Sequence, residues 1–206
     1  KPAFWARRAH KWIGLVIGLQ ALLWMVSGLY MSVLSFDIIH GDHLAHVHAN
    51  PLPAGVARLD PASLQPGLQS YRLKRLLDRE VYELRSADGI ALVDAQIGER
   101  VGPLQTEQVR ALAQAAYQGD AAITSIALLD KAPREVATRP VPLYRVDFAD
   151  RGGTSLYFSP NSGELLARRH ELWRWFDLMW MLHIMDYETR SDVNNTLFRV
   201  AASIAL

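Results

Sequence analysis

The sequence predicts an α+β protein that is held in a membrane by a helix near its N-terminus. Three observations support this prediction. Residues 13–36 contain no charged side chain, residues 60–169 twice show the pattern of a helix, a strand and a β-hairpin, and residues 195–206 begin another apolar helix. Packing helices against antiparallel sheets is the simplest way to bury the apolar side chains of such a repeat.

The first element is a predicted transmembrane helix over residues 12–37. At about 1.5 Å per residue, its uncharged run can cross the roughly 30 Å hydrocarbon layer of a bilayer. Residues 1–11 carry basic side chains and no acidic ones, which is typical of a cytoplasmic flank. We therefore expect a cytoplasmic N-terminus and a main domain on the other side. A cleaved signal peptide is the alternative, but its apolar region usually spans only about 7–15 residues.

The composition excludes several classes of function. The chain has 206 residues, a formal net charge of +1 and 50% hydrophobic residues, between the values of a soluble domain and a polytopic transporter. Basic and acidic residues alternate beyond the N-terminal flank, so no nucleic-acid partner is expected. The absence of cysteine excludes disulfides, thiolate metal sites and covalent c-type haem. The sequence also contains no hydrolase or nucleotide-binding motif, so any redox chemistry would come from a bound cofactor.

The first predicted repeat covers residues 60–104 and follows a histidine-rich connector over residues 38–59. It consists of a weak helix, a strand and a hairpin, which we expect at residues 60–64, at residues 71–77 and from residue 81 onward. The hairpin alternates apolar and polar residues and turns at Asp88 and Gly89. A further turn contains Gly98, which is expected to supply a positive φ.

The second predicted repeat covers residues 105–169. Its helix begins at Thr106 as the N-cap, ends at Gly119 and presents one apolar face. That face consists of Val109, Leu112, Ala113 and Ala116. A strand at residues 123–130 and a hairpin from residue 143 follow, and Gly163 stands in a final turn where Gly98 stands in the first repeat.

Two helices are predicted after the repeats. Residues 170–188 are rich in tryptophan and tyrosine, which favour the headgroup region of a membrane, and we expect this helix to lie along the outer surface. Residues 195–206 begin a second transmembrane helix, with Asn194 or Asn195 as its N-cap. Because this segment is too short to cross a bilayer, we expect further membrane helices beyond it.

Several of these motifs resemble the PepSY family. They are residues 8–15 (Arg-Ala-His-Lys-Trp-Ile-Gly-Leu), the Ser27-Gly28 pair, the turn at residues 159–164 (Ser-Pro-Asn-Ser-Gly-Glu) and the Leu182-His183 pair. The chain is similar in this respect to PepSY-associated transmembrane proteins, which implies a bacterial inner-membrane location with the main domain in the periplasm. Some members resemble haem-bearing reductases that help release iron from siderophores, and soluble PepSY domains are associated with peptidase inhibition. Others carry a flavin reductase module, so flavin would be expected only in a segment beyond residue 206.

The first helix offers one candidate haem site. His10, Gly14 and Gly18 recur at i, i+4 and i+8 and therefore share a helix face. Haem b in a helical bundle needs axial imidazoles and small residues against the ring. The glycines equally suit close helix packing, and His10 equally suits an interfacial position beside basic residues. A second imidazole on this side of the membrane would lie beyond Leu206.

The connector offers a second candidate site, on the outer side. The residues of the connector that could bind a metal ion or orient a ligand are His40, Asp42, His43, His46 and His48. His40 and His43 are spaced to share a helix face, and Asp42 could orient an imidazole. Three interpretations stay open: exposed histidines that cap or bind water, a haem ligand facing His183, or a non-haem metal site for zinc, copper, nickel or iron.

His183, on the aromatic helix, is the last candidate ligand. The residues expected on its side of the helix are Leu172, Trp175, Phe176, Met179 and Leu182. It either packs there with its ring bonded to a backbone carbonyl or binds a haem that these side chains shield. The resemblance to the family's Leu-His motif favours the haem interpretation.

Two functions follow from these expectations. The chain is either part of a haem b-binding electron-transfer system that serves iron uptake, or a non-catalytic accessory subunit of a larger membrane complex. In the first case it is an oxidoreductase that delivers electrons to a periplasmic acceptor such as a ferric siderophore. In both cases its expected partners are membrane lipid and other transmembrane helices or subunits.

Overall fold

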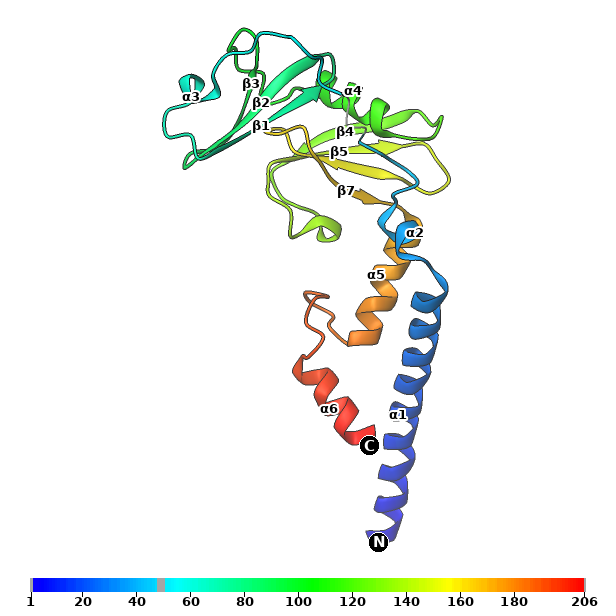
Figure 1. Cartoon of the computed structure of the whole chain (residues 1–206). Helices are drawn as coiled ribbons and strands as arrows, with labels where there is room; N and C mark the ends of the chain where they lie inside the picture. The colour runs from blue at the N-terminus through cyan, green and yellow to red at the C-terminus, as the bar shows by residue number, and fades with distance from the viewer. Residues whose placement is uncertain (1, 48–50, 206) are drawn as a thin grey trace. The chain divides into compact units, whose positions relative to one another are not determined.

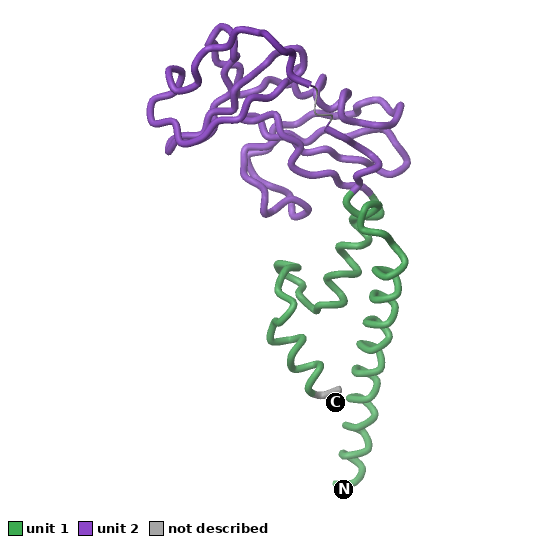
Figure 2. The backbone as a smooth tube through the Cα atoms, in the orientation of Figure 1, with its two compact units in different colours: residues 1–40, 171–206 green, residues 41–170 purple. Residues whose placement is uncertain are grey.

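The computed structural model describes residues 2–47 and 51–205, so His48 of the connector lies outside the described residues. The chain divides into two compact units, Lys1–His40 with Glu171–Leu206, and Gly41–His170 (Figure 2). The first unit is helical, and the second contains two antiparallel sheets (Figure 1). The predicted α+β class, with a long apolar helix at the start, is therefore confirmed.

Helix α1 (Pro2–Val33) is continuous and mostly exposed. It is the one helix among the described residues that is long and apolar enough to span a membrane. One narrow face is less exposed than the rest, because other helices of the same unit pack against it. That face includes Ile17, Gln20, Ala21, Trp24, Ser27 and Gly28.

Helix α5 (Glu171–Ile184) packs against α1 and against the short helix α2 (Phe36–His40). Figure 1 shows α5 alongside the second half of α1, running in the opposite direction. The expected position of residues 170–188 along the outer membrane surface stays a prediction, and the structure shows that α5 forms a lengthwise pair with α1. Gly28 is the reason, since it has no side chain to hold α5 away from α1.

A polar loop over residues 185–195 joins α5 to α6 (Thr196–Ala205). Asn195 Oδ1 accepts a hydrogen bond from the N–H of Phe198 at 2.9 Å, so Asn195 is the N-cap that the sequence suggested. The Phe198 ring lies 5.7 Å from the Trp24 ring, which places α6 against α1 within this unit.

The sheet unit contains two groups, each made of a helix and an antiparallel sheet. The first group consists of α3 (Pro61–Leu64), β1 (Ser70–Leu76), β2 (Arg79–Ser86) and β3 (Gly89–Asp94), with strand order β1-β2-β3. The second consists of α4 (Thr106–Ala116), β4 (Ile123–Leu129), η1 (Arg134–Val136), β5 (Leu143–Phe148), β6 (Ser155–Phe158) and β7 (Leu165–Arg169). The second sheet has strand order β4-β5-β6-β7. Gly98 and Gly163 both have positive φ, +76° and +69°, as predicted.

Helix α4 differs from the prediction at both ends. Its N-cap is Gln105 instead of Thr106, because the backbone is still extended at Gln105, whose N–H donates to the Gln108 side chain at 2.8 Å. The helix ends at Ala116, before Gly119. The connector causes this early end: the His46 N–H donates to the Ala116 carbonyl and the Gln118 N–H donates to the Leu44 carbonyl, both at 2.9 Å.

One main hydrophobic core joins the two groups. Leu76, Val81 and Leu92 of the first sheet pack in the same cluster as residues of α4 and of the second sheet. Val109 and Val146 in that cluster are fully buried. The two groups therefore fold as one body, in which α4 lies between apolar side chains of both sheets.

Candidate functional site

The helical unit brings His183 of α5 against Ser27 and Gly28 of α1. His183 Nδ1 lies 3.0 Å from Ser27 Oγ. A Cβ atom placed on Gly28 would lie 3.4 Å from His183 Cε1. The glycine therefore lets the imidazole lie against the backbone of α1.

The hydrogen bonds of Ser27 indicate which nitrogen of His183 carries the proton. Ser27 Oγ lies 2.6 Å from the Leu23 carbonyl oxygen and 3.2 Å from that of Trp24, so its single hydrogen is donated to a carbonyl. Oγ then accepts the Nδ1–H of His183. Ser27 thus takes the place of the backbone carbonyl in the packing interpretation of His183. The lone pair is left on Nε2, an atom with which neutral imidazole binds metals.

Two buried hydrogen-bond donors lie on the same face of α1 as Ser27. Gln20 Nε2 and Trp24 Nε1 are buried without a hydrogen-bond partner in the part of the chain that the structure describes. An unpaired buried donor costs about 1–3 kcal/mol. This face is therefore suited to an additional group that brings acceptor oxygens.

The other candidates on α1 are open. His10 is exposed. Apart from the adjacent residues and the nearby backbone of α1 itself, no atom of the described residues lies within 4 Å of a Cβ placed on Gly14 or Gly18. The described helices therefore do not pack on this glycine face. A flat ring and a helix of another protein both remain compatible with it.

The connector histidines are divided between the two units. His40 belongs to α2, where its ring lies 6.0 Å from that of Phe36. His43 belongs to the sheet unit, where its ring lies 5.9 Å from the buried ring of His170. Asp42 pairs with Arg168 at 3.3 Å, and its role in orienting an imidazole stays a prediction.

His170 could not be singled out from the sequence, because it stands alone after β7 and approaches His43 only in the folded protein. Among residues 2–47 and 51–205, no group of three or more histidine, aspartate or glutamate side chains is placed to hold a metal ion. The predicted non-haem metal site in the connector therefore receives no support from the described residues. His46, whose N–H donates to the Ala116 carbonyl at the end of α4, is exposed.

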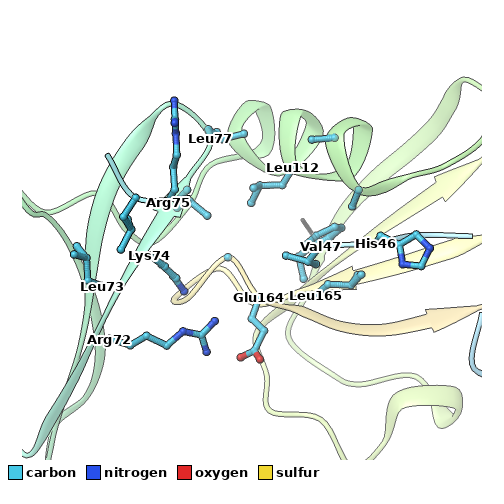
Figure 3. A pocket seen from close by; sticks show the side chains of 16 residues that line it. His46, Val47, Arg72, Leu73, Lys74, Arg75, Leu77, Leu112, Glu164 and Leu165 are labelled. Atoms are coloured by element: carbon cyan, nitrogen blue, oxygen red, sulfur yellow. The ribbon is translucent and has the colours of Figure 1, made fainter. Parts of the chain in front are cut away.

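The sheet unit also contains a cavity of about 700 Å³, which the sequence did not reveal (Figure 3). Residues 72–77, from β1 and the following turn, form one wall of the cavity. Gly163, Glu164 and Leu165 form the opposite wall. Leu112, Ala115 and Ala116 of α4 and Phe158 of β6 supply apolar surface. These segments are distant in sequence, so no local motif could have indicated the cavity.

Charged residues of β1 line this cavity. Lys74 Nζ contacts Glu83 at 2.5 Å and the Ser162 carbonyl oxygen at 2.7 Å. Burial raises the pKa of the Glu83 carboxyl, but hydrogen bonds from Lys74 and Arg85 outweigh burial and lower its pKa overall. Lys74 is therefore neutralised by Glu83, whereas Arg72 is exposed and has no ion pair among the described residues.

The fold and these sites define an α+β protein whose described residues include one candidate membrane helix, a serine-oriented histidine and a cavity between two sheets. Comparison of the chain with protein-family models, with curated proteins and with solved structures found no match. Its function is therefore argued from its own residues.

Proposed function

We propose that the protein is a membrane-anchored, haem b-binding electron-transfer protein of the PepSY type, which serves an acceptor such as a ferric siderophore. The observation that carries this proposal is the contact of His183 with Ser27 and Gly28. It orients an imidazole with Nε2 available for iron, next to a helix backbone without a side chain in the way.

The surrounding residues suit a haem group. The two orphan donors, Gln20 Nε2 and Trp24 Nε1, share a helix face with Ser27 and can pair with the carboxylates that haem carries. Helix α5 adds the aromatic and apolar side chains of Trp175, Phe176 and Met179, which would shield a bound haem from water. Haem supplies one-electron transfer at its iron when it is bound, and the protein supplies the ligand, its orientation and a low dielectric.

The proposal is tested by a reduced-minus-oxidised visible spectrum of the purified protein in nanodiscs after addition of haem. We expect a b-type α band that is strongly reduced in the His183→Ala variant and unchanged in His46→Ala, the control for removal of an exposed imidazole. His10→Ala and His40→Ala then show whether either residue is a second ligand. A featureless spectrum from folded wild-type protein would exclude haem b.

The membrane topology is part of the same proposal. The basic flank favours a cytoplasmic N-terminus, and the sheet unit then lies in the periplasm of a bacterial cell. Because the chain contains no cysteine, single cysteines at the exposed positions Ala3 and Asp130 report their compartments without background. An impermeant maleimide added to intact spheroplasts should label Asp130→Cys and not Ala3→Cys, and the reverse labelling would contradict this topology.

An accessory-subunit role is a second candidate because the face at Gly14 and Gly18 is open. Small residues spaced in this way allow a helix of another subunit to approach closely. Gly14→Leu with Gly18→Leu should then release partners that co-purify with the wild type but leave the His183 spectrum unchanged. Loss of haem without loss of partners would favour a flat ring on this face.

A further inference from the structure

We propose that the cavity of the sheet unit binds a short extended peptide, which adds as a strand to the open edge of β1 and carries an acidic residue beside apolar ones. The first reason is that β1 is an edge strand. It pairs with β2 alone in the three-stranded sheet, so no strand among residues 2–47 and 51–205 lies beside its other edge.

The register shows which backbone groups face this open edge. Leu76 pairs with Arg79 across a two-residue turn, and Lys74 with Val81 and Arg72 with Glu83. In an antiparallel pair, alternate residues bond to the neighbouring strand. The backbone groups of Tyr71, Leu73 and Arg75 therefore point outward, and among the described residues none of them bonds to another segment.

The cavity follows this edge. Neighbouring strand residues point to opposite faces, yet residues 72–77 all line the cavity. Because the cavity contacts every residue of this stretch and not every second one, it lies along the edge of the strand, where a ligand can reach the backbone N–H and C=O groups. About 700 Å³ is also within the usual size of ligand sites. An unpaired edge of this kind is a template for strand addition.

Charge and apolar surface indicate the sequence of the peptide. Figure 3 shows Arg72 and Lys74 directed across the cavity toward the side of Glu164, with Leu112 and Leu165 beyond them. Lys74 is neutralised by Glu83, so the remaining lining charges are Arg72, Arg75 and the opposing Glu164. The balance is positive and favours an acidic side chain near Arg72. Leu76, on the same face of β1, lies in the apolar cluster with Leu112 and Leu165, which favours an apolar side chain further along.

The test uses the full chain in nanodiscs and blocked pentapeptides as probes. The parent peptide is Glu-Thr-Val-Thr-Leu, which places one acidic and two apolar side chains on one face of a strand. The panel adds the reversed sequence, a version with lysine for glutamate, and a version methylated on both threonine nitrogens. Calorimetry measures affinity, and residue-resolved hydrogen exchange measures protection of the Leu73 and Arg75 amides.

We expect the parent or the reversed peptide to bind and to protect those two amides. The lysine and N-methyl versions should each bind about tenfold more weakly, which is the scale of one charge-assisted hydrogen bond. If no peptide of the panel binds, or if binding leaves both amides unprotected, the proposal is wrong.

Two pairs of variants separate backbone pairing from charge. Arg75→Pro and Arg75→Ala both remove the guanidinium, but proline alone removes the outward N–H. Binding should fall about tenfold further in the proline variant, and equal affinities would overturn the proposal. Arg72→Gln should remove the preference for glutamate over lysine, whereas Arg79→Gln, at a position of β2 outside the cavity lining, should not. Unchanged thermal melting of each variant excludes misfolding.

A small amphipathic anion is the competing ligand. The soluble probe 4-phenylbutyrate carries an apolar body and a carboxylate but no peptide backbone. If it binds in an Arg72-dependent way and the peptides do not, the cavity binds small anions and the peptide proposal is wrong. Because none of these measurements uses a spectrum or haem, their failure is distinct from failure of the electron-transfer proposal.

Discussion

His183 Nδ1 and Ser27 Oγ lie 3.0 Å apart, although 156 positions separate these residues along the chain. Ser27→Ala removes the acceptor for Nδ1–H and frees the ring to rotate. Loss of such an orienting partner typically weakens metal affinity about 10–100-fold, and we expect haem content to fall accordingly. Modification of His183 by diethyl pyrocarbonate, read by mass spectrometry, should also become faster and does not depend on haem.

The control for this change is Ser32→Ala. Ser32 Oγ donates to the Gly28 carbonyl at 2.7 Å on an exposed part of the same helix, so its removal alters α1 without touching His183. Equal modification rates in Ser27→Ala and Ser32→Ala would show that the serine does not orient the imidazole.

Gly28→Val should separate α5 from α1 at His183. The Cβ would already be in contact with the ring, 3.4 Å from His183 Cε1, and the two methyl groups of valine extend beyond the Cβ and crowd the imidazole. Overpacking of this kind typically costs about 1–3 kcal/mol. Gly18→Val is the matched control, since a Cβ on Gly18 has no described atom within 4 Å apart from adjacent residues and the nearby backbone of α1. Quenching of tryptophan emission by brominated lipid should increase in Gly28→Val alone.

Features that depend on neighbouring residues could be predicted from the sequence. The hairpin turns, the strands beside them and the positive φ of Gly98 and Gly163 follow from alternation and turn chemistry within a few positions. The long helix α1 follows from a run of uncharged residues, because length and composition alone decide whether a helix can span a membrane.

Features that depend on contacts between distant segments could not be predicted. The Ser27–His183 hydrogen bond, the approach of His43 to His170 and the cavity beside β1 have no local pattern. The early end of α4 is similar, because the connector takes up the Ala116 carbonyl before the glycine expected to end the helix. The lengthwise pairing of α5 with α1 depends on Gly28, which the sequence marked only as a family motif.

Glu83 should make the stability of the sheet unit depend on pH. Its carboxyl is 1% exposed and contacts Lys74 and Arg85. Its pKa in the folded protein is lowered from the ordinary value near 4.5. The stabilisation is therefore complete above that ordinary value and is lost as the pH falls through the lower, folded pKa. Urea unfolding between pH 7 and pH 3, followed by pulsed hydrogen exchange of β2, should show this loss.

Glu83→Gln tests the assignment. It leaves Lys74 without its anion, and breaking a buried pair typically costs about 3–5 kcal/mol. The variant should be destabilised at pH 7 and should lose part of the acid dependence. Glu99→Gln removes an exposed carboxyl and should change neither property. Identical pH profiles for the wild type and Glu83→Gln would show that another group controls acid sensitivity.

Gly163→Ala should destabilise the sheet unit by more than the cost of placing alanine at a positive φ, because the new methyl group also clashes with its neighbours. Gly163 has a φ of +69°, and a Cβ there would lie 2.7 Å from Leu76 Cδ1 and 3.1 Å from Leu104 Cδ1. Gly67 has nearly the same φ, +68°, but a Cβ placed on it has no described atom within 4 Å other than those of the adjacent residues. Gly67→Ala therefore measures the conformational cost, roughly 1–2 kcal/mol, and Gly163→Ala should cost about 1–3 kcal/mol more. Equal unfolding free energies in urea would contradict the packing at Leu76.

Asp186 should determine whether the loop between α5 and α6 is ordered. Its carboxylate accepts hydrogen bonds at 3.0–3.1 Å from the backbone N–H groups of Glu188, Thr189, Ser191 and Asp192. It also accepts one from the Thr189 hydroxyl. Asp186→Ala leaves these donors without their acceptor, so the loop should open and become sensitive to proteases.

Asp192→Ala is the matched control for Asp186→Ala, because Asp192 is exposed and its side chain accepts a hydrogen bond from the Asn194 N–H. We expect rapid cleavage within residues 185–195 in Asp186→Ala and near wild-type resistance in Asp192→Ala. Trp180 Nε1 donates to the Arg190 carbonyl at 2.9 Å, so opening of the loop should also shift tryptophan emission. If both variants resist cleavage equally, the ion pair between Arg190 and Asp177 is sufficient to hold the loop, and the double variant Asp177→Ala with Asp186→Ala should then be cleaved.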